Sequence, residues 1–191
     1  MIWSKQIMTF PQVIQPQTVS VLIRYMKKID FENASVGPVA NTINKKIRNV
    51  TKFTLNPFEG DFTQSHWANF LNYTIKNFMN EYIAQKNLRE FVGPIFNCNQ
   101  IELLKYEEGN FYKPHVDGGV GFNRTLSAIL FLNNDYEGGE LSFKNIQTEK
   151  EEHVNLKGKP GDLVIWPSNF HYPHGVMPVQ KGRRYTVVAW A

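Results

Sequence analysis

The chain has 191 residues, of which 42% are apolar and 20% are charged, and its formal net charge is +4. This length and apolar content fit one compact domain with a sizeable core, and they argue against a disordered tail and a long multidomain protein. The small, scattered positive charge does not favour a nucleic-acid partner, and the single cysteine, Cys98, excludes an intramolecular disulfide framework.

The first hundred residues predict two amphipathic helices. From Thr18 to Asp30, apolar residues recur at the spacing of one helical face, and a second helix is expected from about Ser65 to Gln85. The second helix carries a stripe of large residues that we interpret as core packing: Trp67, Phe70, Leu71, Phe78 and Tyr82. Residues 33–62 are expected to form a connection with one strand at Val50 to Leu55, and the basic residues Lys45, Lys46 and Arg48 a solvated face.

The chain after Pro94 predicts short strands separated by turn residues. The expected strands are Ile101–Tyr106, Thr125–Leu132, Glu140–Phe143, His153–Leu156, Leu163–Trp166 and Tyr185–Trp190. Strands at this spacing without intervening helices indicate an antiparallel sandwich or barrel. No stretch approaches the roughly 18 apolar residues of a membrane span, so we expect a soluble, cytoplasmic protein without a membrane partner.

The triplet His115-Val116-Asp117 is the first candidate for a metal site. On a strand, residues i and i+2 point to the same face, so the imidazole and the carboxylate can converge on one ion. The candidate third ligand is His174, beyond the strand that ends at Trp166. Two histidines and one carboxylate on adjacent strands form the triad that holds iron(II) and leaves positions open, although zinc accepts the same ligands.

Arg184 stands ten residues after His174 and opens the expected strand RYTVVAW. Thr186 lies on the same strand face two residues later. A guanidinium pairs bidentately with a carboxylate, and a neighbouring hydroxyl can add a hydrogen bond. This combination suits the far end of a dicarboxylic keto acid and favours iron over zinc.

Five ordered motifs over about residues 98–191 resemble the prolyl 4-hydroxylase family of iron(II)/2-oxoglutarate-dependent dioxygenases. They are Tyr106-x-x-Gly109-x-x-Tyr112-x-x-His115-x-Asp117, Asn123-Arg124-Thr125-Leu126 through Phe131-Leu132-Asn133, Glu137-Gly138-Gly139-Glu140-Leu141-x-Phe143, Pro160-Gly161-Asp162-Leu163, and His174-x-Val176-x-Pro178-Val179-x-x-Gly182-x-Arg184. His171, three residues before His174, is the alternative third ligand. The last motif and the ten-residue spacing to Arg184 match the family only when they are counted from His174.

The resemblance implies a mainly β protein with packed helices. Its core is expected to be a double-stranded β-helix, a cupin-like jelly roll over residues 98–191 with the site. Residues 1–97 supply a helical support and the first strands, so that residues 1–191 form a single dioxygenase domain. Nothing in residues 1–97 resembles a family that we can assign.

The resemblance also implies the cofactors and residue roles. Fe(2+) is held by His115, Asp117 and His174; 2-oxoglutarate is the cosubstrate, O2 the oxidant, and ascorbate a candidate cofactor. The distal carboxylate of 2-oxoglutarate is expected on Arg184, helped by Thr186 and Tyr106. The substrate side is expected to be lined by Arg124, Tyr112 and Trp190.

The implied activity is hydroxylation of a peptidyl residue, with proline as the first candidate and a peptide or protein as the partner. One alternative keeps this chemistry on another amino acid or a small molecule, and another is a non-catalytic jelly-roll binding module. The nucleic-acid repair branch of the superfamily usually carries a second arginine where this chain has Trp190, which argues against a nucleic-acid substrate. The oligomeric state is not indicated by the sequence.

One departure concerns the strand after the His-x-Asp motif. These prolyl hydroxylases often carry a tyrosine where this chain has Phe131, so one hydroxyl that usually reaches the 2-oxoglutarate carboxylate is missing. Residues Gly118 to Gly121 lack the helix and the Lys-Ser/Thr pair of a phosphate-binding loop. We therefore expect them to belong to a mobile loop over the site.

Overall fold

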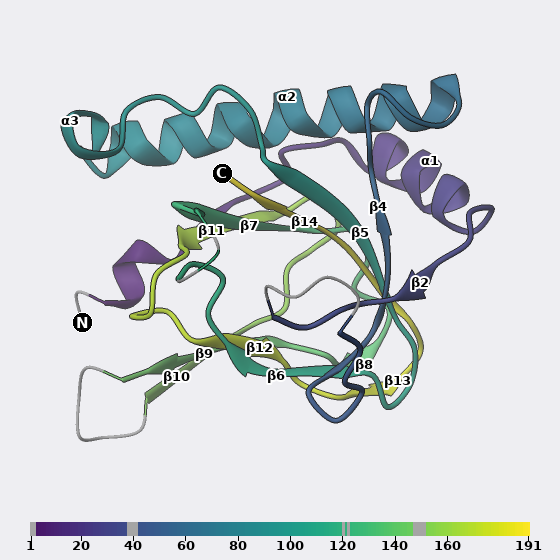
Figure 1. Ribbon diagram of the computed structural model, residues 1–191. Helices are drawn as coiled ribbons and strands as arrows, with labels where there is room; N and C mark the ends of the chain where they lie inside the picture. The colour runs from purple at the N-terminus through teal and green to yellow at the C-terminus, as the bar shows by residue number, and fades with distance from the viewer. Residues whose placement is uncertain (1–2, 38–41, 120, 122, 147–151) are drawn as a thin grey trace.

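Two antiparallel sheets face each other in the computed structural model, which describes residues 3–37, 42–119, 121, 123–146 and 152–191 (Figure 1). The larger sheet has the order β1-β11-β7-β14-β5-β4-β2. Its strands are β1 (Met8–Phe10), β2 (Glu32–Asn33), β4 (Thr51–Thr54), β5 (Gln100–Tyr106), β7 (Leu126–Phe131), β11 (Leu163–Pro167) and β14 (Arg184–Trp190). Each of the six strands expected after Pro94 is present with shifts of one or two residues at its ends.

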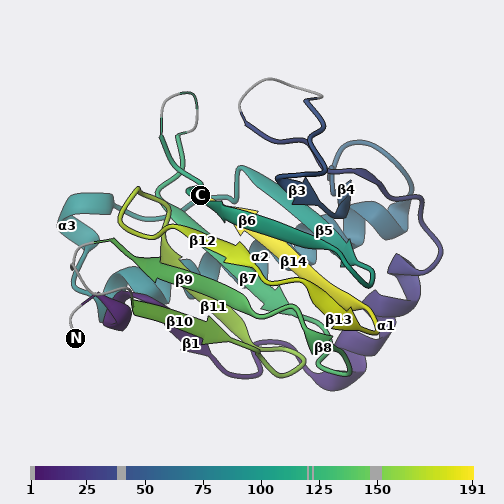
Figure 2. The ribbon, with the colours of Figure 1, turned by 90° about the horizontal axis from the view of Figure 1, so that it is seen from below.

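The smaller sheet has the order β10-β9-β12-β6-β3; it lies opposite the larger sheet in Figure 1 and in front of it in the view from below (Figure 2). Its strands are β3 (Arg48–Asn49), β6 (Phe111–His115), β9 (Leu141–Asn145), β10 (Glu152–Leu156) and β12 (His174–Val176). A two-stranded ladder joins β8 (Glu137–Gly138) to β13 (Val179–Lys181). The arrangement is the predicted jelly-roll sandwich.

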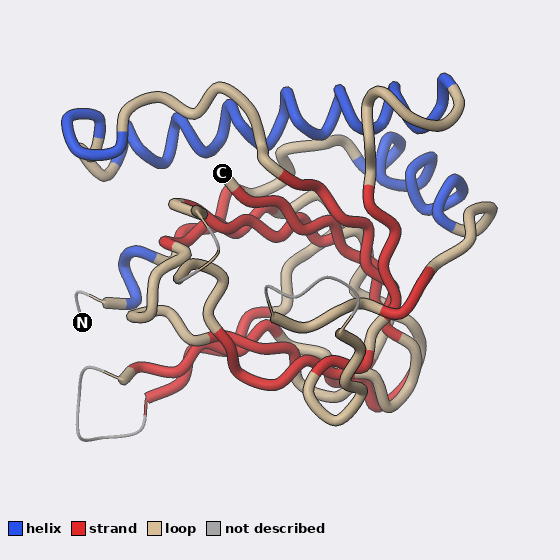
Figure 3. The backbone as a smooth tube through the Cα atoms, in the orientation of Figure 1, coloured by secondary structure: helices blue, strands red, loops and turns tan. Residues whose placement is uncertain are grey.

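The helices lie in the first half of the chain, and the two longest of them cover the outer face of the larger sheet (Figure 3). They are the 3-10 turn η1 (Ser4–Gln6), α1 (Pro16–Met26), α2 (Phe62–Gln85) and the short α3 (Arg89–Val92). Helix α2 begins three residues before the predicted start because the Asp61 side chain accepts a 2.8 Å hydrogen bond from the Gln64 amide. None of the described helices is long and apolar enough to cross a membrane.

Alternation along the strands divides the buried residues into two layers. On β14, Tyr185, Val187 and Ala189 face outward and pack with the buried faces of α1 and α2. Val188 and Trp190 of the same strand face the space between the sheets, together with side chains of β5, β7, β9 and β11. Arg184 and Thr186 point to the same side of β14 as Val188 and Trp190, so their polar groups lie inside the sandwich.

Two strands that carry site residues were not predicted. Strand β6 contains Lys113 and Pro114 and is mostly half-exposed, and β12 has only three residues with Gly175 at its centre. Neither has an apolar alternation, so neither resembles a strand in the sequence. Both exist because they pair with each other and because β12 also pairs with β9.

Candidate active site

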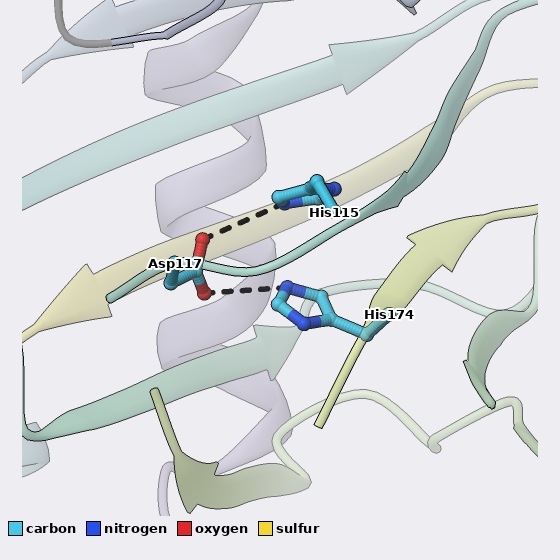
Figure 4. Close-up of side chains that lie close together, drawn as sticks. All are labelled: His115, Asp117 and His174. Atoms are coloured by element: carbon cyan, nitrogen blue, oxygen red, sulfur yellow. Dashed lines mark ion pairs between the residues drawn. The ribbon is translucent and has the colours of Figure 1, made fainter. Parts of the chain in front are cut away.

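Three potential metal ligands meet between the sheets (Figure 4). Nε2 of His115 lies 3.5 Å from Oδ1 of Asp117, and Nε2 of His174 lies 3.2 Å from the other carboxylate oxygen. Each residue offers one ligand atom, and these three atoms all lie within 4.8 Å of one another. The group therefore has the composition and spacing that a divalent metal ion requires.

Strand pairing brings the two histidines together. His174 of β12 is the register partner of His115, the last residue of β6, as expected for ligands on adjacent strands. The prediction that Asp117 lies on the same strand as His115 was wrong. The strand ends at His115, and the chain after it turns inward, where Gly118 donates a 2.7 Å hydrogen bond to the Ser168 carbonyl oxygen.

Both imidazoles have Nδ1 beside a backbone carbonyl oxygen. Nδ1 of His115 lies 3.0 Å from the Lys113 carbonyl oxygen, and Nδ1 of His174 lies 3.0 Å from the Tyr172 carbonyl oxygen. Because a carbonyl oxygen only accepts, the neutral form of each imidazole carries its proton on Nδ1 and leaves the lone pair on Nε2. The two Nε2 atoms therefore face Asp117 as ready metal ligands.

The electrostatics of the group favour the protonation states that metal binding needs. Burial by itself raises the pKa of Asp117, but the adjacent imidazoles of His174 and His115 hold that pKa well below its usual range. Burial and the nearby His174 lower the pKa of His115. An ionised carboxylate beside a neutral imidazole is the form in which these side chains bind metals.

Two serines that the sequence did not reveal hold the carboxylate in place. The Ser127 hydroxyl donates a 2.7 Å hydrogen bond to Oδ2 of Asp117 and lies 2.7 Å from the Ser168 hydroxyl. Both serines are fully buried. The available signal was a polar residue inside the otherwise apolar strand LSAILF, because a buried hydroxyl requires a partner.

The predicted substrate-side residues lie around the metal group. Tyr112 stacks on His115 with ring centroids 3.6 Å apart, and the Arg124 guanidinium lies 3.9 Å from the Trp190 ring centroid. All four residues line one cavity of about 440 Å³, together with Asp117. The cavity gives the metal group an opening to an external molecule.

Arg48 also lines this cavity, and its interpretation as a solvated residue was wrong. It is buried, forms a 3.2 Å ion pair with Glu102, and lies 4.8 Å from the Tyr112 ring centroid. Its neighbours Lys45 and Lys46 are exposed. Pairing of β3 with β6 moves this arginine inward, which no local pattern indicates.

Arg184 lies deeper in the sandwich and is fully buried. Its Nη1 donates a 3.2 Å hydrogen bond to Thr186, and its Cζ lies 4.9 Å from the Tyr106 ring centroid and 5.5 Å from that of Phe131. Its Nε and Nη2 have no hydrogen-bond partner among the described residues. A buried cation with two unused donors points to an anionic ligand.

The rival ligand His171 does not join the metal group. Its backbone carbonyl accepts a 2.8 Å hydrogen bond from the Trp3 indole, and its ring packs against Phe170. Of the loop predicted over the site, Val120 lies outside the described residues, so that prediction stays untested.

Residues 101–191 match the family model described as the 2OG-Fe(II) oxygenase superfamily, where 2OG is 2-oxoglutarate. The second half of the chain is therefore similar to a 2OG-Fe(II) oxygenase domain. A PKHD-type hydroxylase of Idiomarina loihiensis is 32% identical over 95 residues, which are 48% of this chain and 41% of that protein. Human prolyl 3-hydroxylase 2 is 39% identical over 67 residues, which are 35% of this chain and 9% of that protein. The chain thus spans less than half the length of these two relatives.

The oxygenase fold extends beyond the sequence match. A solved prolyl hydroxylase of Trichoplax adhaerens, in complex with a hypoxia inducible factor peptide fragment, superposes with a TM-score of 0.73 at 17% identity. The superposition covers 97% of this chain and 82% of that one. The likeness therefore includes most of residues 1–97, for which the sequence suggested no relative.

The groups that a 2OG-Fe(II) oxygenase requires fit the residues present. Two Nε2 atoms and one carboxylate suit iron(II), and the unused donors of Arg184 suit the distal carboxylate of 2-oxoglutarate. Asp117 contacts Ser127, whereas Arg184 lies near Phe131, four residues further along β7. This spacing corresponds to about 13 Å along a strand and leaves room for a short dicarboxylate between the two groups.

Proposed function

We propose that this protein is an iron(II)- and 2-oxoglutarate-dependent dioxygenase that hydroxylates a peptidyl residue, with proline as the first candidate. The reaction converts R–H, 2-oxoglutarate and O2 into R–OH, succinate and CO2. One observation carries the proposal: the metal-ligand group of His115, Asp117 and His174 lies between the same two sheets as the unpaired donors of Arg184.

The chain contributes binding and orientation. His115, Asp117 and His174 hold iron(II), while Arg184 and Thr186 bind the distal carboxylate of 2-oxoglutarate and Tyr106 packs beside it. When bound, iron and 2-oxoglutarate supply the oxidising power that breaks an unactivated C–H bond. The surrounding aromatic and aliphatic side chains exclude water and keep competing molecules away from the reacting centre.

The residues that line the cavity beside the metal group orient the substrate. Tyr112 and Trp190 offer flat apolar surfaces on which a pyrrolidine ring can pack, and Arg124 can donate hydrogen bonds to a peptide carbonyl. Peptidyl proline is further supported by the name of the human relative and by the peptide bound to the Trichoplax enzyme. We further propose that residues 1–191 form a single domain, that ascorbate supports turnover, and that the protein acts in the cytoplasm.

The test of the enzyme class is succinate formation. Purified protein with iron(II), 2-oxoglutarate, ascorbate and O2 is expected to produce succinate, and His115→Ala and Arg184→Ala are expected to lose nearly all of this activity. His171→Ala and Arg183→Ala are matched controls, because His171 lies outside the metal group and the Arg183 side chain is exposed. Wild-type protein that binds neither iron(II) nor 2-oxoglutarate would favour the non-catalytic binding module instead.

The substrate class needs a separate experiment. Proline-rich peptides, the same peptides with alanine in place of proline, and free L-proline are incubated with the active enzyme and examined by mass spectrometry. The proposal predicts the mass of one added oxygen atom on the proline peptides alone. Oxidation of the alanine peptides or of free proline would assign the same chemistry to another residue or to a small molecule.

A further inference from the structure

Tyr136, between β7 and β8, has a buried hydroxyl without a partner. The residue is 4% exposed, and its oxygen makes no hydrogen bond to any described residue. A buried hydroxyl that leaves water without a new hydrogen bond costs free energy, so native proteins rarely retain one. Such an atom in an oxygenase interior indicates a partner that arrives with a ligand.

Tyr136 lies beside Arg184. A Cβ atom placed on Gly139 would lie 3.2 Å from both Cδ of Arg184 and Cε2 of Tyr136, so the two side chains flank the same backbone position. The hydroxyl of one and two guanidinium nitrogens of the other are unpaired. Three unused polar atoms thus gather at one end of the interior.

The hydroxyl is available as a donor. Burial raises the pKa of Tyr136, while the positive charge of Arg184 and the approach of its guanidinium to the hydroxyl act in the opposite direction without cancelling the rise. The phenol therefore stays neutral at neutral pH and keeps its proton. On the exposed side, Lys157 lies 4.4 Å from the Tyr136 ring centroid and donates a hydrogen bond to the Tyr136 carbonyl oxygen, which holds the ring in place.

The neighbouring strand cannot supply this donor. Phe131 is the register partner of Thr186 and lies 5.5 Å from Cζ of Arg184, but its ring carries no hydroxyl. Resting on the proposed function, we infer that the Tyr136 hydroxyl donates a hydrogen bond to the distal carboxylate of 2-oxoglutarate. With Arg184, it selects a 2-oxo acid that carries a second carboxylate.

The test is binding rather than turnover. Wild type and Tyr136→Phe, each loaded with iron(II) under argon, are titrated calorimetrically with 2-oxoglutarate and with 2-oxobutyrate, which has no distal carboxylate. The substitution is expected to weaken 2-oxoglutarate binding by about 10- to 100-fold, the range for losing a hydrogen bond to a charged group, and to leave 2-oxobutyrate binding unchanged. Tyr185→Phe is the matched control, because Tyr185 faces the helices on the outside of the same sheet.

Thermal unfolding without ligand separates a binding role from a structural one. Because Tyr136→Phe removes an unpaired hydroxyl and keeps the ring, the variant is expected to melt at the wild-type temperature or above it. A lower melting temperature, equal weakening of both oxo acids, or unchanged 2-oxoglutarate affinity would each overturn the inference. If wild-type protein with iron(II) binds no 2-oxoglutarate, the proposed function fails together with the inference.

Discussion

At the scale of single residues, the position of the Asp117 carboxylate depends on hydroxyl groups behind it. Asp117 lies beyond the end of β6, so no strand ladder fixes its backbone. The Ser127 hydroxyl, supported by Ser168, instead fixes the carboxylate from the rigid β7. Partners of this kind orient a metal ligand and tune its affinity.

We therefore expect Ser127→Ala to weaken iron(II) binding by roughly 10- to 100-fold while the protein remains folded. Competition with a chromophoric chelator under argon measures the affinity, and circular dichroism checks the fold. Ser65→Ala is the control, because Ser65 lies on α2, outside the jelly roll, and its hydroxyl donates a hydrogen bond to the Pro57 carbonyl oxygen. Wild-type affinity in Ser127→Ala would show that Asp117 holds its position without this hydrogen bond.

At the scale of elements, the site depends on the close approach of β12 to β6. A Cβ atom on Gly175 would lie 2.6 Å from the Tyr112 carbonyl oxygen and 3.0 Å from the Pro114 nitrogen. Both contacts are to backbone, so a side chain at this position must push the two strands apart. The same pair of strands holds His174 opposite His115.

Gly175→Ala is accordingly expected to separate the two imidazoles and to weaken iron(II) binding by about tenfold or more, measured by the same chelator competition. Ser142→Ala is a matched control, because Ser142 is the register partner of Gly175 on β9 and lies on the other side of β12. If the control and Gly175→Ala bind iron(II) equally well, the strand spacing does not set the metal geometry.

At the scale of the whole molecule, the two halves of the chain share one core. Leu71, Ile75 and Met79 of α2 are completely buried in the same cluster as Leu103 of β5 and Val187 of β14. The first half also sends Arg48 into the cavity beside the metal group. Helices and jelly roll therefore support each other's packing and complete one site.

This shared core predicts cooperative unfolding. Hydrogen exchange followed by mass spectrometry at increasing guanidinium concentration is expected to show α2 and β14 losing protection at the same midpoint. Leu71→Ala is expected to lower both midpoints together, since deleting a buried leucine costs roughly 2–5 kcal/mol of unfolding free energy. Tyr73→Ala, at an exposed position of α2, is expected to change neither midpoint. Early loss of protection in α2 alone would contradict the single-domain proposal.

The sequence by itself determined the candidate site residues and the longer strands of the larger sheet. His115, Asp117, His174 and Arg184 were identifiable because ligand chemistry limits the residue types and because their order and spacing match the motifs of the family that the chain resembles. The longer strands of the larger sheet were identifiable because their burial produces runs of apolar residues, as in β7 and β14, whereas the short β1 and β2 were not predicted.

Only the tertiary structure decided which further residues join the site. Arg48 lies in no recognisable motif, and the contacts of Ser127 and Tyr136 become apparent only when folding buries each polar group beside a partner or leaves it without one. Likewise β6 and β12 carry no strand pattern and form through pairing with residues about sixty positions away. Long-range pairing and burial are properties of the whole chain, so local residue patterns do not reveal them.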